Sequence, residues 1–201
     1  MNSDIRKFFQ VGGKSEKKLS KKKPLNANKI SIKEWKVFTD GSTINNGKRN
    51  ARGGIGVFFD DFSTDNLGEE FNIDGKTSNN ICELEAVRRA IMIIISKKDF
   101  KKTDKIQICS DSSYVISCIT IWSNNWEKNG WKRKNRSGKS VPVKNVELIK
   151  SIKSLYNRYN IQFKHIKAHR TLGTNINPNS LEYQEWYGNK RADELANLGS
   201  K

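Results

Sequence analysis

Short apolar segments near the start of the chain predict an antiparallel meander. Trp35–Asp40 and Gly53–Asp60 are rich in β-branched and aromatic residues, and the turn sequence Asn45-Asn46-Gly47 lies between them, which is typical of a β-hairpin. A third predicted strand, near Glu69–Ile73, would complete the meander.

The next segment changes from strand to helix periodicity. Between Asn79 and Lys97 the apolar residues recur at spacings of three and four, which predicts a long buried helix capped by Ser78 or Asn79. A meander followed by alternating strands and helices predicts an α/β fold, in which helices flank a mixed five-stranded sheet of antiparallel and then parallel strands. The remaining pattern predicts a strand, two helices, a strand and a last helix, over Lys105–Cys109, Ser112–Trp122, Asn145–Tyr156, Ile161–Ile166 and about Tyr187–Leu198.

The first 34 residues differ in composition from the rest of the chain. They are dominated by Lys, Ser, Asn and Gly, and they carry ten basic and three acidic residues. Such a segment buries too little apolar surface to fold, so we expect a disordered basic tail over residues 1–34 and a folded domain over residues 35–201. Of the net charge of +17, the tail holds +7 (10 − 3) and the domain +10 (17 − 7). This charge indicates a polyanionic partner, most commonly nucleic acid, with a merely solubilising basic surface as the alternative.

Three features argue against a membrane or secreted protein. The longest apolar run, Ile91–Ile95, is far shorter than the roughly 20 residues of a membrane-spanning helix. The N-terminus has no apolar signal-peptide core. The three cysteines, Cys82, Cys109 and Cys118, form neither a C-x-x-C pair nor an even set, which is typical of a protein of a reducing, intracellular compartment.

Four acidic residues of this basic chain occupy positions that predict a shared site. Asp40 and Asp111 each end a predicted strand, Glu83 lies on the apolar stripe of the long helix, and Asp193 lies near the start of the last helix. If the two strands are neighbours, their carboxyl ends bring Asp40 and Asp111 together. Clustered carboxylates repel one another unless a cation neutralises them, and oxygen ligands without a His or Cys set select Mg²⁺ or Mn²⁺. Taken singly, each residue has an ordinary alternative role in a turn, a cap or a first helical turn.

The sequence around these four residues resembles type 1 ribonuclease H, in the same order and at comparable spacings over most of residues 35–201. The resemblance rests on Thr39–Ser42, Ser78–Leu84, Ser110–Ile116 and Gly188–Asp193. It implies a ribonuclease H-like fold and an endoribonuclease that hydrolyses the RNA strand of RNA/DNA hybrids, leaving 5′-phosphate and 3′-hydroxyl ends. The implied role is the removal of RNA primers or R-loop RNA during DNA replication. Two Mg²⁺ ions, or Mn²⁺ in their place, would be held for two-metal-ion catalysis by Asp40, Glu83, Asp111 and Asp193.

Two histidines stand close together in the sequence, and the resemblance separates their roles. His165 is predicted to be a strand residue that packs on the sheet. His169 corresponds to the mobile histidine with which the family assists proton transfer and product release. This chain departs from the family pattern after His169, because Thr171–Tyr187 intervenes before Gly188-Asn189. A zinc site at the His-x₃-His pair is the alternative, for which the sequence offers no third or fourth ligand.

A basic block over residues 122–148 contains three tryptophans at spacings of four and five beside a cluster of Lys and Arg. Such a surface suits a nucleic-acid backbone held on aromatic platforms, although each ring has the alternative of packing in the core. The block resembles the basic protrusion with which cellular type 1 enzymes grip the DNA strand. The resemblance implies that Trp122 and Trp126 contact deoxyriboses and that Asn145 binds a DNA phosphate with Ser78. It also implies that Asn79 and Asn80 contact the minor groove.

The tail contains an aliphatic residue three positions before an aromatic pair. On one helical turn Ile5, Phe8 and Phe9 share a face suited to a hydrophobic pocket. The segment resembles the PCNA-interacting motif of replication proteins, with Asn2 where that motif usually has Gln, and implies a sliding clamp as partner; a chance hydrophobic cluster is the alternative. The basic run Lys17–Pro24 is a candidate nuclear localisation signal, with a plain nucleic-acid tether as the alternative. We therefore expect a monomer that acts in the nucleus or at another site of DNA replication.

Two other functions are compatible with the predicted fold. One is a non-catalytic hybrid-binding module with a decayed site, against which the intact acidic quartet argues. The other is a different nuclease or a recombinase of the same fold, which the basic block disfavours.

Overall fold

The computed structural model describes residues 32–168 and 176–201. The chain divides into two units, and all helices and strands of the described residues lie in the second unit, Ile32–Lys201. Within this described part, no helix combines the length and the apolar character needed to cross a membrane.

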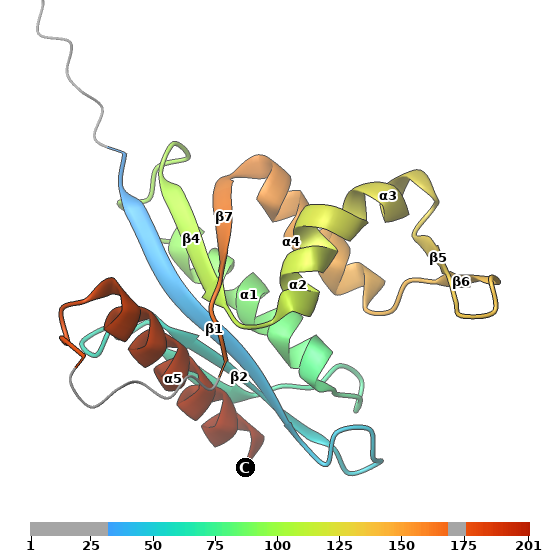
Figure 1. Cartoon of the computed structure of the whole chain (residues 1–201), viewed down its shortest axis with the longest axis horizontal. Coiled ribbons are helices and arrows are strands. Elements are labelled where there is room, and N and C mark those ends of the chain that lie inside the picture. The colour runs from blue at the N-terminus through green and yellow to red at the C-terminus, as the bar shows by residue number, and fades with distance from the viewer. Residues whose placement is uncertain (1–31, 169–175) are drawn as a thin grey trace, which may run out of the picture. The chain divides into compact units, whose positions relative to one another are not determined.

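Five strands form the main sheet of this unit, in the order β3-β2-β1-β4-β7 (Figure 1). β1 pairs antiparallel with β2, and β2 with β3, whereas β4 is parallel to both β1 and β7. The predicted α/β fold with a mixed five-stranded sheet is therefore confirmed. The strands span Glu34–Ile44 (β1), Arg52–Phe58 (β2), Leu67–Glu70 (β3), Lys105–Ser110 (β4) and Asn160–His165 (β7).

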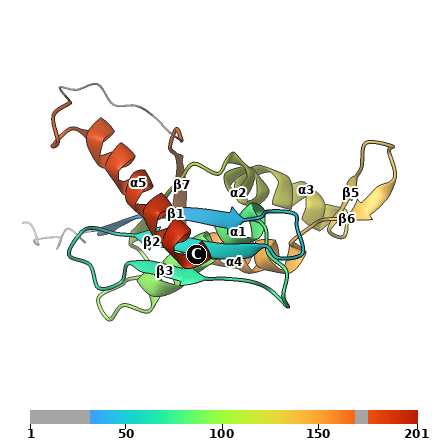
Figure 2. The same ribbon diagram turned by 90° about the horizontal axis from the view of Figure 1, so that it is seen from below.

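Helices cover both faces of the sheet (Figure 2). α1 (Asn79–Ile95) and α4 (Val146–Arg158) pack together on one face, and α5 (Leu181–Ser200) crosses the other face over β2 and β1. Successive residues of β1 alternate between the faces, so that Val37 lies in the larger core with residues of α1 and α4, and Phe38 in the smaller core with residues of α5.

β1 continues beyond Asp40, where the sequence predicted its end. The parallel pairing with β4 stops at Thr39 and Ser110, while the antiparallel pairing with β2 continues to Ile44. The predicted strand end is therefore wrong, because a second partner supports the strand after the first has ended. Asp40 lies inside β1, at the first position that β4 no longer covers.

The third strand ends earlier than predicted. It spans Leu67–Glu70 rather than Glu69–Ile73. Asp74 and Gly75 both adopt positive φ, 50° and 73°, in a tight turn that joins the isolated bridge of Ile73 and Lys76. Two successive positive φ values are typical of a hairpin turn with Asp-Gly at its centre, so the residues after Glu70 belong to this small turn.

α5 begins nearly two turns before its predicted start at Tyr187. The Ser180 side chain caps it by accepting a hydrogen bond from the Tyr183 N–H at 3.1 Å. The sequence signal for this start was Ser180 followed by Glu182 in the first turn, where an acidic side chain favours a helix. Asp193, predicted near the start of the helix, consequently lies in its second half.

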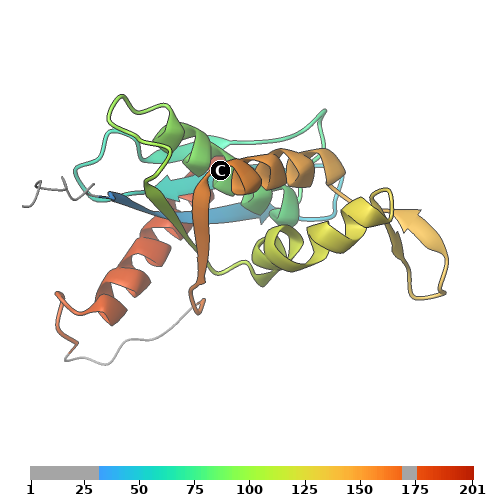
Figure 3. The ribbon, with the colours of Figure 1, turned by 90° about the horizontal axis from the view of Figure 1, so that it is seen from above.

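The segment between β4 and α4 projects from the sheet. α2 (Ser113–Ser117), a π-helical turn (Cys118–Trp122) and α3 (Ser123–Lys128) follow one another directly, so the helical run continues beyond its predicted end at Trp122. A short hairpin that was not predicted, β5 (Lys132–Lys134) and β6 (Ser140–Pro142), follows it. Figure 3 shows this hairpin at the end of the unit farthest from the first turns of α5.

Two glycines allow helices to lie against the sheet at backbone distance. A Cβ added at Gly41 in β1 would lie 2.2 Å from the backbone nitrogen of Glu83 in α1. A Cβ added at Gly56 in β2 would lie 2.0 Å from the carbonyl oxygen of Ala192 in α5. A larger residue at either position would push a helix away from the sheet, and each contact lies at or next to an acidic residue, Glu83 or Asp193.

Candidate active site

Asp40 and Asp111 lie side by side where β1 and β4 separate. The parallel pairing ends with Thr39 opposite Ser110, so each aspartate is the next residue of its chain segment. Asp40 is 7% exposed, and Asp111 is partly buried. The structure thus brings the two carboxylates together at the carboxyl ends of neighbouring parallel strands, where ligand sites of open sheets commonly lie.

Glu83 completes a carboxylate triad from the second turn of α1. One oxygen from each of Asp40, Glu83 and Asp111 lies within 4.8 Å of the other two. Glu83 is 9% exposed, and its Oε2 has no hydrogen-bond partner among the described residues. A buried carboxylate oxygen without a partner costs free energy unless a cation or a proton compensates for it. A set of hard oxygen donors with such an atom fits a divalent cation of the Mg²⁺ or Mn²⁺ type.

Burial and mutual repulsion raise the pKa of two of these carboxyl groups. The pKa of Asp40 rises from 3.8 to about 7, first because of burial and then because of the charges of Asp111 and Asp193. The pKa of Glu83 rises from 4.5 to about 10, first because of burial and then because of Asp40 and Asp111. A hydrogen bond from the Gly41 backbone opposes both increases. The site therefore retains protons near neutral pH unless a cation takes their place.

Asp193 reaches the same cavity from α5. All four acidic residues line this carboxylate cavity, which has a volume of about 460 Å³, although Asp193 does not belong to the close triad. Asp193 is held by a bridge: its Oδ2 accepts a hydrogen bond from Asn197 Nδ2 at 3.0 Å, and Asn197 Oδ1 accepts one from Ser42 Oγ at 2.6 Å. Ser42 follows Asp40 by two residues in β1, so the bridge connects the strand of one carboxylate with the helix of another.

Two further contacts to Asp111 were not predicted. Asn189 Nδ2 donates a hydrogen bond to Asp111 Oδ2 at 3.2 Å, and His165 Nε2 lies 3.2 Å from the Asp111 carbonyl oxygen. The signal for Asn189 was its spacing of four residues from Asp193, because residues at i and i+4 share a helix face. His165 is a strand residue as predicted, but it is exposed at the end of β7, so its predicted packing on the sheet is wrong.

Some predicted functional residues lie outside the described residues, namely Ile5, Phe8, Phe9 and His169. Lys167 and Ala168, which come directly before His169, line the carboxylate cavity. The last described residues before His169 therefore lie at the wall of this cavity.

A second cavity, which we call the tryptophan groove, adjoins the first. Five of the six residues predicted to bind substrate line it, and the sixth, Asn79, lines the carboxylate cavity. The first residues of α1 thus separate the two cavities, because Asn79 borders one and its neighbours Ser78 and Asn80 border the other. The groove has a volume of about 620 Å³ and is lined by Ser78, Asn80, Tyr114, Trp122, Trp126, Arg133, Val143, Lys144 and Asn145.

The aromatic rings of the groove pack on one another and remain accessible. Trp122 is 40% exposed, and its ring centroid lies 5.6 Å from that of Trp126 and 6.3 Å from that of Tyr114. Asn145 Nδ2 lies 3.5 Å from the Tyr114 hydroxyl. Trp126 also packs against the larger core, so this ring combines a core position with a place in the groove.

Comparison with known proteins assigns this architecture to a family. Residues 32–201 match the RNase H family. The chain belongs to the RNase H family. A Ribonuclease H of Schizosaccharomyces pombe is 33% identical over 164 residues, which make up 82% of this chain and 52% of that protein. A Ribonuclease H of Clostridium botulinum is 32% identical over 167 residues, 83% of this chain and 95% of that protein. The chain therefore spans about half the length of the first relative and nearly all of the second.

Solved structures of RNase H proteins share the fold of this family member. LC9-RNase H1, a type 1 RNase H, aligns with a TM-score of 0.60 at 21% identity, over 85% of this chain and 74% of that one. The PFV RNase H domain aligns with a TM-score of 0.55 at 24% identity, over 85% of this chain and 96% of that one. At such identities the likeness establishes the fold alone.

Proposed function

We infer that this chain is an endoribonuclease that hydrolyses the RNA strand of RNA/DNA hybrids. A shared fold alone would not carry this inference, because one fold hosts many functions. The observation that carries it is a buried carboxylate triad in a cavity, on a chain that matches the RNase H family over residues 32–201. The relatives of Schizosaccharomyces pombe and Clostridium botulinum both bear the name Ribonuclease H.

Two Mg²⁺ ions, with Mn²⁺ as a substitute, are the cofactors of this proposal. Such ions, when bound, lower the pKa of an attacking water and stabilise the leaving oxygen, which produces 5′-phosphate and 3′-hydroxyl ends. Support comes from the oxygen donor set, the unpartnered Glu83 Oε2 and the raised pKa values of Asp40 and Glu83. The residues assigned to the ions are Asp40, Glu83, Asp111 and Asp193.

The polar neighbours of the carboxylates hold them in place. Asn189 donates to Asp111, and Asn197 donates to Asp193. Gly41 leaves room for the backbone of α1 beside β1, which brings Glu83 to the other carboxylates. The chain thus organises the acidic oxygens before any substrate arrives, as catalysis by charge stabilisation requires.

The DNA strand of the hybrid is assigned to the tryptophan groove. Its deoxyriboses pack on Trp122 and Trp126, and a phosphate is bound by Asn145 with Ser78. The Ser78 hydroxyl oxygen accepts the capping hydrogen bond of α1, so its own O–H stays available to donate to a phosphate oxygen. Asn79 and Asn80 border the two cavities and contact the minor groove between the strands. Contact with deoxyribose on one strand and ribose on the other distinguishes a hybrid from duplex RNA or DNA.

His169 is assigned to proton transfer and product release. His169→Ala is expected to slow cleavage by far less than Asp111→Asn does, in single-turnover assays on the same hybrid. An equal loss, or no loss, would remove this assignment.

The biological setting of the proposal is DNA replication, with the chain acting as a monomer that removes primer or R-loop RNA in a nucleus or another reducing compartment. The three cysteines are buried and free of disulfides, which is compatible with a reducing compartment. A sliding clamp is the proposed partner of Ile5, Phe8 and Phe9. The double substitution Phe8→Ala/Phe9→Ala is expected to abolish clamp pull-down, and unchanged binding would exclude this partner site.

The decisive experiment compares the cleavage of end-labelled RNA/DNA hybrid, duplex RNA and duplex DNA, with Mg²⁺ or EDTA, by the wild type and Asp111→Asn. We expect cleavage of the hybrid alone, dependent on the metal and lost in the variant. Tight hybrid binding without cleavage would favour a binding module, and cleavage of duplex DNA would favour a nuclease or recombinase of another class.

A further inference from the structure

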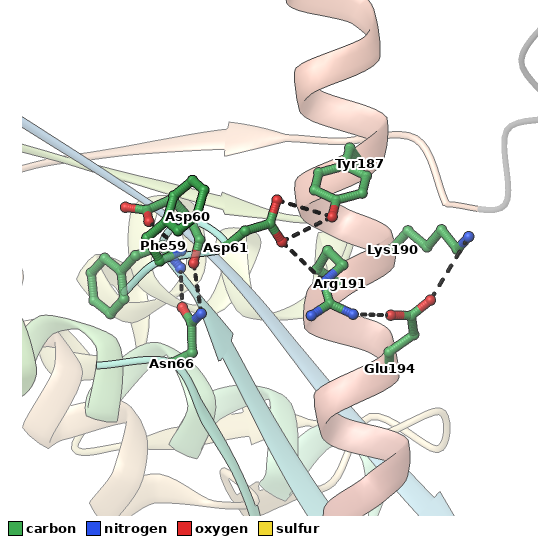
Figure 4. Close-up of polar contacts among 9 residues, drawn as sticks. Phe59, Asp60, Asp61, Asn66, Tyr187, Lys190, Arg191 and Glu194 are labelled. Carbon is green, nitrogen blue, oxygen red and sulfur yellow. Dashed lines mark hydrogen bonds and ion pairs between the residues drawn. The ribbon is translucent and has the colours of Figure 1, made fainter. Parts of the chain in front are cut away.

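The first turns of α5 have two faces with different surroundings. One face is anchored on the loop after β2, as Figure 4 shows. The Tyr187 hydroxyl donates to both carboxylate oxygens of Asp61, at 2.9 and 3.1 Å, and Arg191 Nε lies 3.6 Å from Asp61 Oδ1. The ring of Tyr183 stacks on that of Tyr187, with centroids 5.9 Å apart and an interplanar angle of 7°.

The loop that carries Asp61 is itself held in place. Asn66 accepts a hydrogen bond from the Phe59 N–H at 2.8 Å and donates one to the Asp60 carbonyl oxygen at 2.7 Å (Figure 4). Tyr187 also packs against the smaller core, with its ring 6.1 Å from that of Phe58. The first turns of α5 are therefore fixed in position by several contacts to the loop after β2 and to the smaller core.

The other face of α5 continues the carboxylate cavity. Trp186, Asn189, Lys190 and Asp193 lie on it at helical spacings of three and four, and all four line the same cavity as the triad. Over seven residues a helix rises about 10 Å, so Trp186 and Lys190 extend the wall of the cavity beyond Asp193. The first turns of α5 lie at the end of the unit opposite to the hairpin of β5 and β6 (Figure 1), whose Arg133 lines the tryptophan groove.

Trp186 lines the carboxylate cavity and lies outside the buried clusters of the described residues. Its neighbour Tyr187 packs against a buried cluster. Trp186 is half-buried and contacts the Tyr183 ring, with centroids 5.6 Å apart, but belongs to none of the buried clusters formed by the described residues. Lys190 Nζ lies 5.3 Å from the centroid of the Trp186 ring, and its ion pair with Glu194 is long, at 3.8 Å. An accessible ring beside a loosely paired ammonium group suits a sugar–phosphate chain, because the ring packs on a base or ribose and the lysine neutralises a phosphate.

We propose that Trp186 and Lys190 form a second nucleic-acid contact of this protein, which holds the RNA strand on the side of the carboxylate cavity away from the tryptophan groove. The inference rests on the proposed function. It assigns the RNA strand to this contact because the cavity that contains the contact also contains the triad that cuts RNA, while the DNA strand occupies the separate groove. Trp186, which lies in the segment before Gly188-Asn189, thus gives the first turns of α5 a place in substrate binding.

The test measures hybrid binding by fluorescence anisotropy in the Asp111→Asn background, where no substrate is consumed. Trp186→Leu and Lys190→Gln are each expected to weaken binding by about five- to tenfold, while Trp186→Phe, which keeps an aromatic ring, recovers most of the loss. If Trp186 had only a structural role, Trp186→Phe and Trp186→Leu variants of equal melting temperature would bind the hybrid equally well. Lys190→Gln is expected to fold normally, because the Lys190 side chain is half-exposed. It therefore tests the contact even where a substitution of Trp186 impairs folding.

The chain offers a matched control in Lys33→Gln. Lys33 Nζ lies 3.4 Å from the centroid of the Trp35 ring, is paired with Asp99 at 2.8 Å and is as exposed as Lys190, but it lines neither cavity. The same charge change at this lysine is expected to leave hybrid binding within twofold of the parent. An equal loss at Lys33 and Lys190 would reduce the effect to net charge and overturn the proposal.

Shortened hybrids identify the strand. The loss caused by Trp186→Leu is expected to disappear when the RNA strand is shortened from one of its ends, and to persist when only the DNA strand is shortened. Parent-like binding by Trp186→Leu and Lys190→Gln, or a loss that follows the DNA strand, would overturn the inference. Failure of the proposed function is distinguishable, because the wild type would then not cleave a full-length hybrid at all.

Discussion

The carboxylate cavity and the tryptophan groove adjoin at the start of α1 but are built in opposite ways. In the cavity, Asp40 and Glu83 are 7% and 9% exposed, and burial raises the pKa of both. In the groove, Trp122 is 40% exposed, and the basic residues Arg133 and Lys144 line the same wall. One region concentrates like charges that oppose folding, and the other presents aromatic area and positive charge to a partner.

This difference shows which region does chemistry and which provides affinity. Carboxylates that repel one another remain close together only where the surrounding structure holds them in place. Here they are held by the close approach of α1 at Gly41 and by the side-chain amides of Asn189 and Asn197. Exposed rings cost the fold little and become useful when a ligand covers them. Variants of the four carboxylates should therefore change turnover and metal response, and variants in the groove should change substrate affinity.

The largest expected effect that separates the two regions is that of Glu83→Gln. The substitution keeps the side-chain size and removes one charge from the metal-binding set, so kcat on a labelled hybrid should fall by about 1000-fold or more while KM stays within about twofold. Steady-state kinetics measure both constants. A raised KM with an intact kcat would assign Glu83 to substrate binding instead.

The next effect concerns the pH dependence of stability without metal. A carboxyl group whose pKa is higher in the folded state binds protons more tightly when folded, so its stabilising contribution is complete at low pH and is lost as the pH rises through the folded value. With the pKa of Asp40 raised to about 7, this group alone should lower the free energy of unfolding in EDTA by about 2 to 3 kcal/mol between about pH 5 and pH 8. Glu83, whose pKa is raised further, should add to this fall.

Asp40→Asn provides the comparison for this experiment. The variant lacks the titrating group, so its free energy of unfolding should depend less on pH and should exceed that of the wild type at about pH 8 in EDTA. Urea denaturation at several pH values measures the difference, which added Mg²⁺ should reduce by binding the wild type. A wild type that is more stable at high pH without metal would contradict the assigned electrostatics.

A smaller effect is expected from Trp122→Ala in the groove. Removal of a ring on which a deoxyribose packs should raise KM by about tenfold and leave kcat nearly unchanged, because the carboxylates are untouched. Ile121→Ala is the matched control, since Ile121 is an adjacent exposed apolar residue, 63% exposed. Equal effects at both positions would mean that general destabilisation of the π-helical turn, and not ring contact, explains the loss.

The smallest effect is expected from the bridge that holds Asp193. Asn197→Ala should raise the Mg²⁺ concentration for half-maximal cleavage by about fivefold and leave the rate at saturating Mg²⁺ close to that of the wild type. Ser42→Ala should act in the same direction, and the double variant should add little, because both residues belong to one hydrogen-bonded chain. Asn157→Ala, at an exposed position of α4, is the control, and an additive double variant would show that the bridge does not act as a unit.

Most of the fold was predictable because its elements carry local signals. The hairpin between β1 and β2, the Ser78 cap of α1 and the alternation of β4 are properties of neighbouring residues. One error arose where a distant segment decided the outcome. β1 continues past Asp40 because β2 pairs with it as far as Ile44, and no local pattern shows where one partner strand ends and another continues.

In the candidate site, too, the sequence predicts some features and the tertiary structure decides others. The four carboxylates were found from their segments and their order, but their contacts were not. Asn197 and Ser42 are separated by 155 positions and meet only because α5 crosses β1. The predicted start of α5 is too late, although Ser180 and Glu182 are local signals of a helix start. Trp186 lies before the predicted start and is for this reason absent from the predicted site.

The sequence by itself determined the class of fold, the basic character of the chain and the identity of the acidic residues, because periodicity, charge and motif order are local or additive properties. Only the tertiary structure decided that three carboxylates come within 4.8 Å of one another, that Glu83 is buried against Gly41, and that one face of α5 continues the cavity. These facts depend on the register of strands and on helices that approach the sheet at backbone distance, which are set by contacts between residues far apart in the chain.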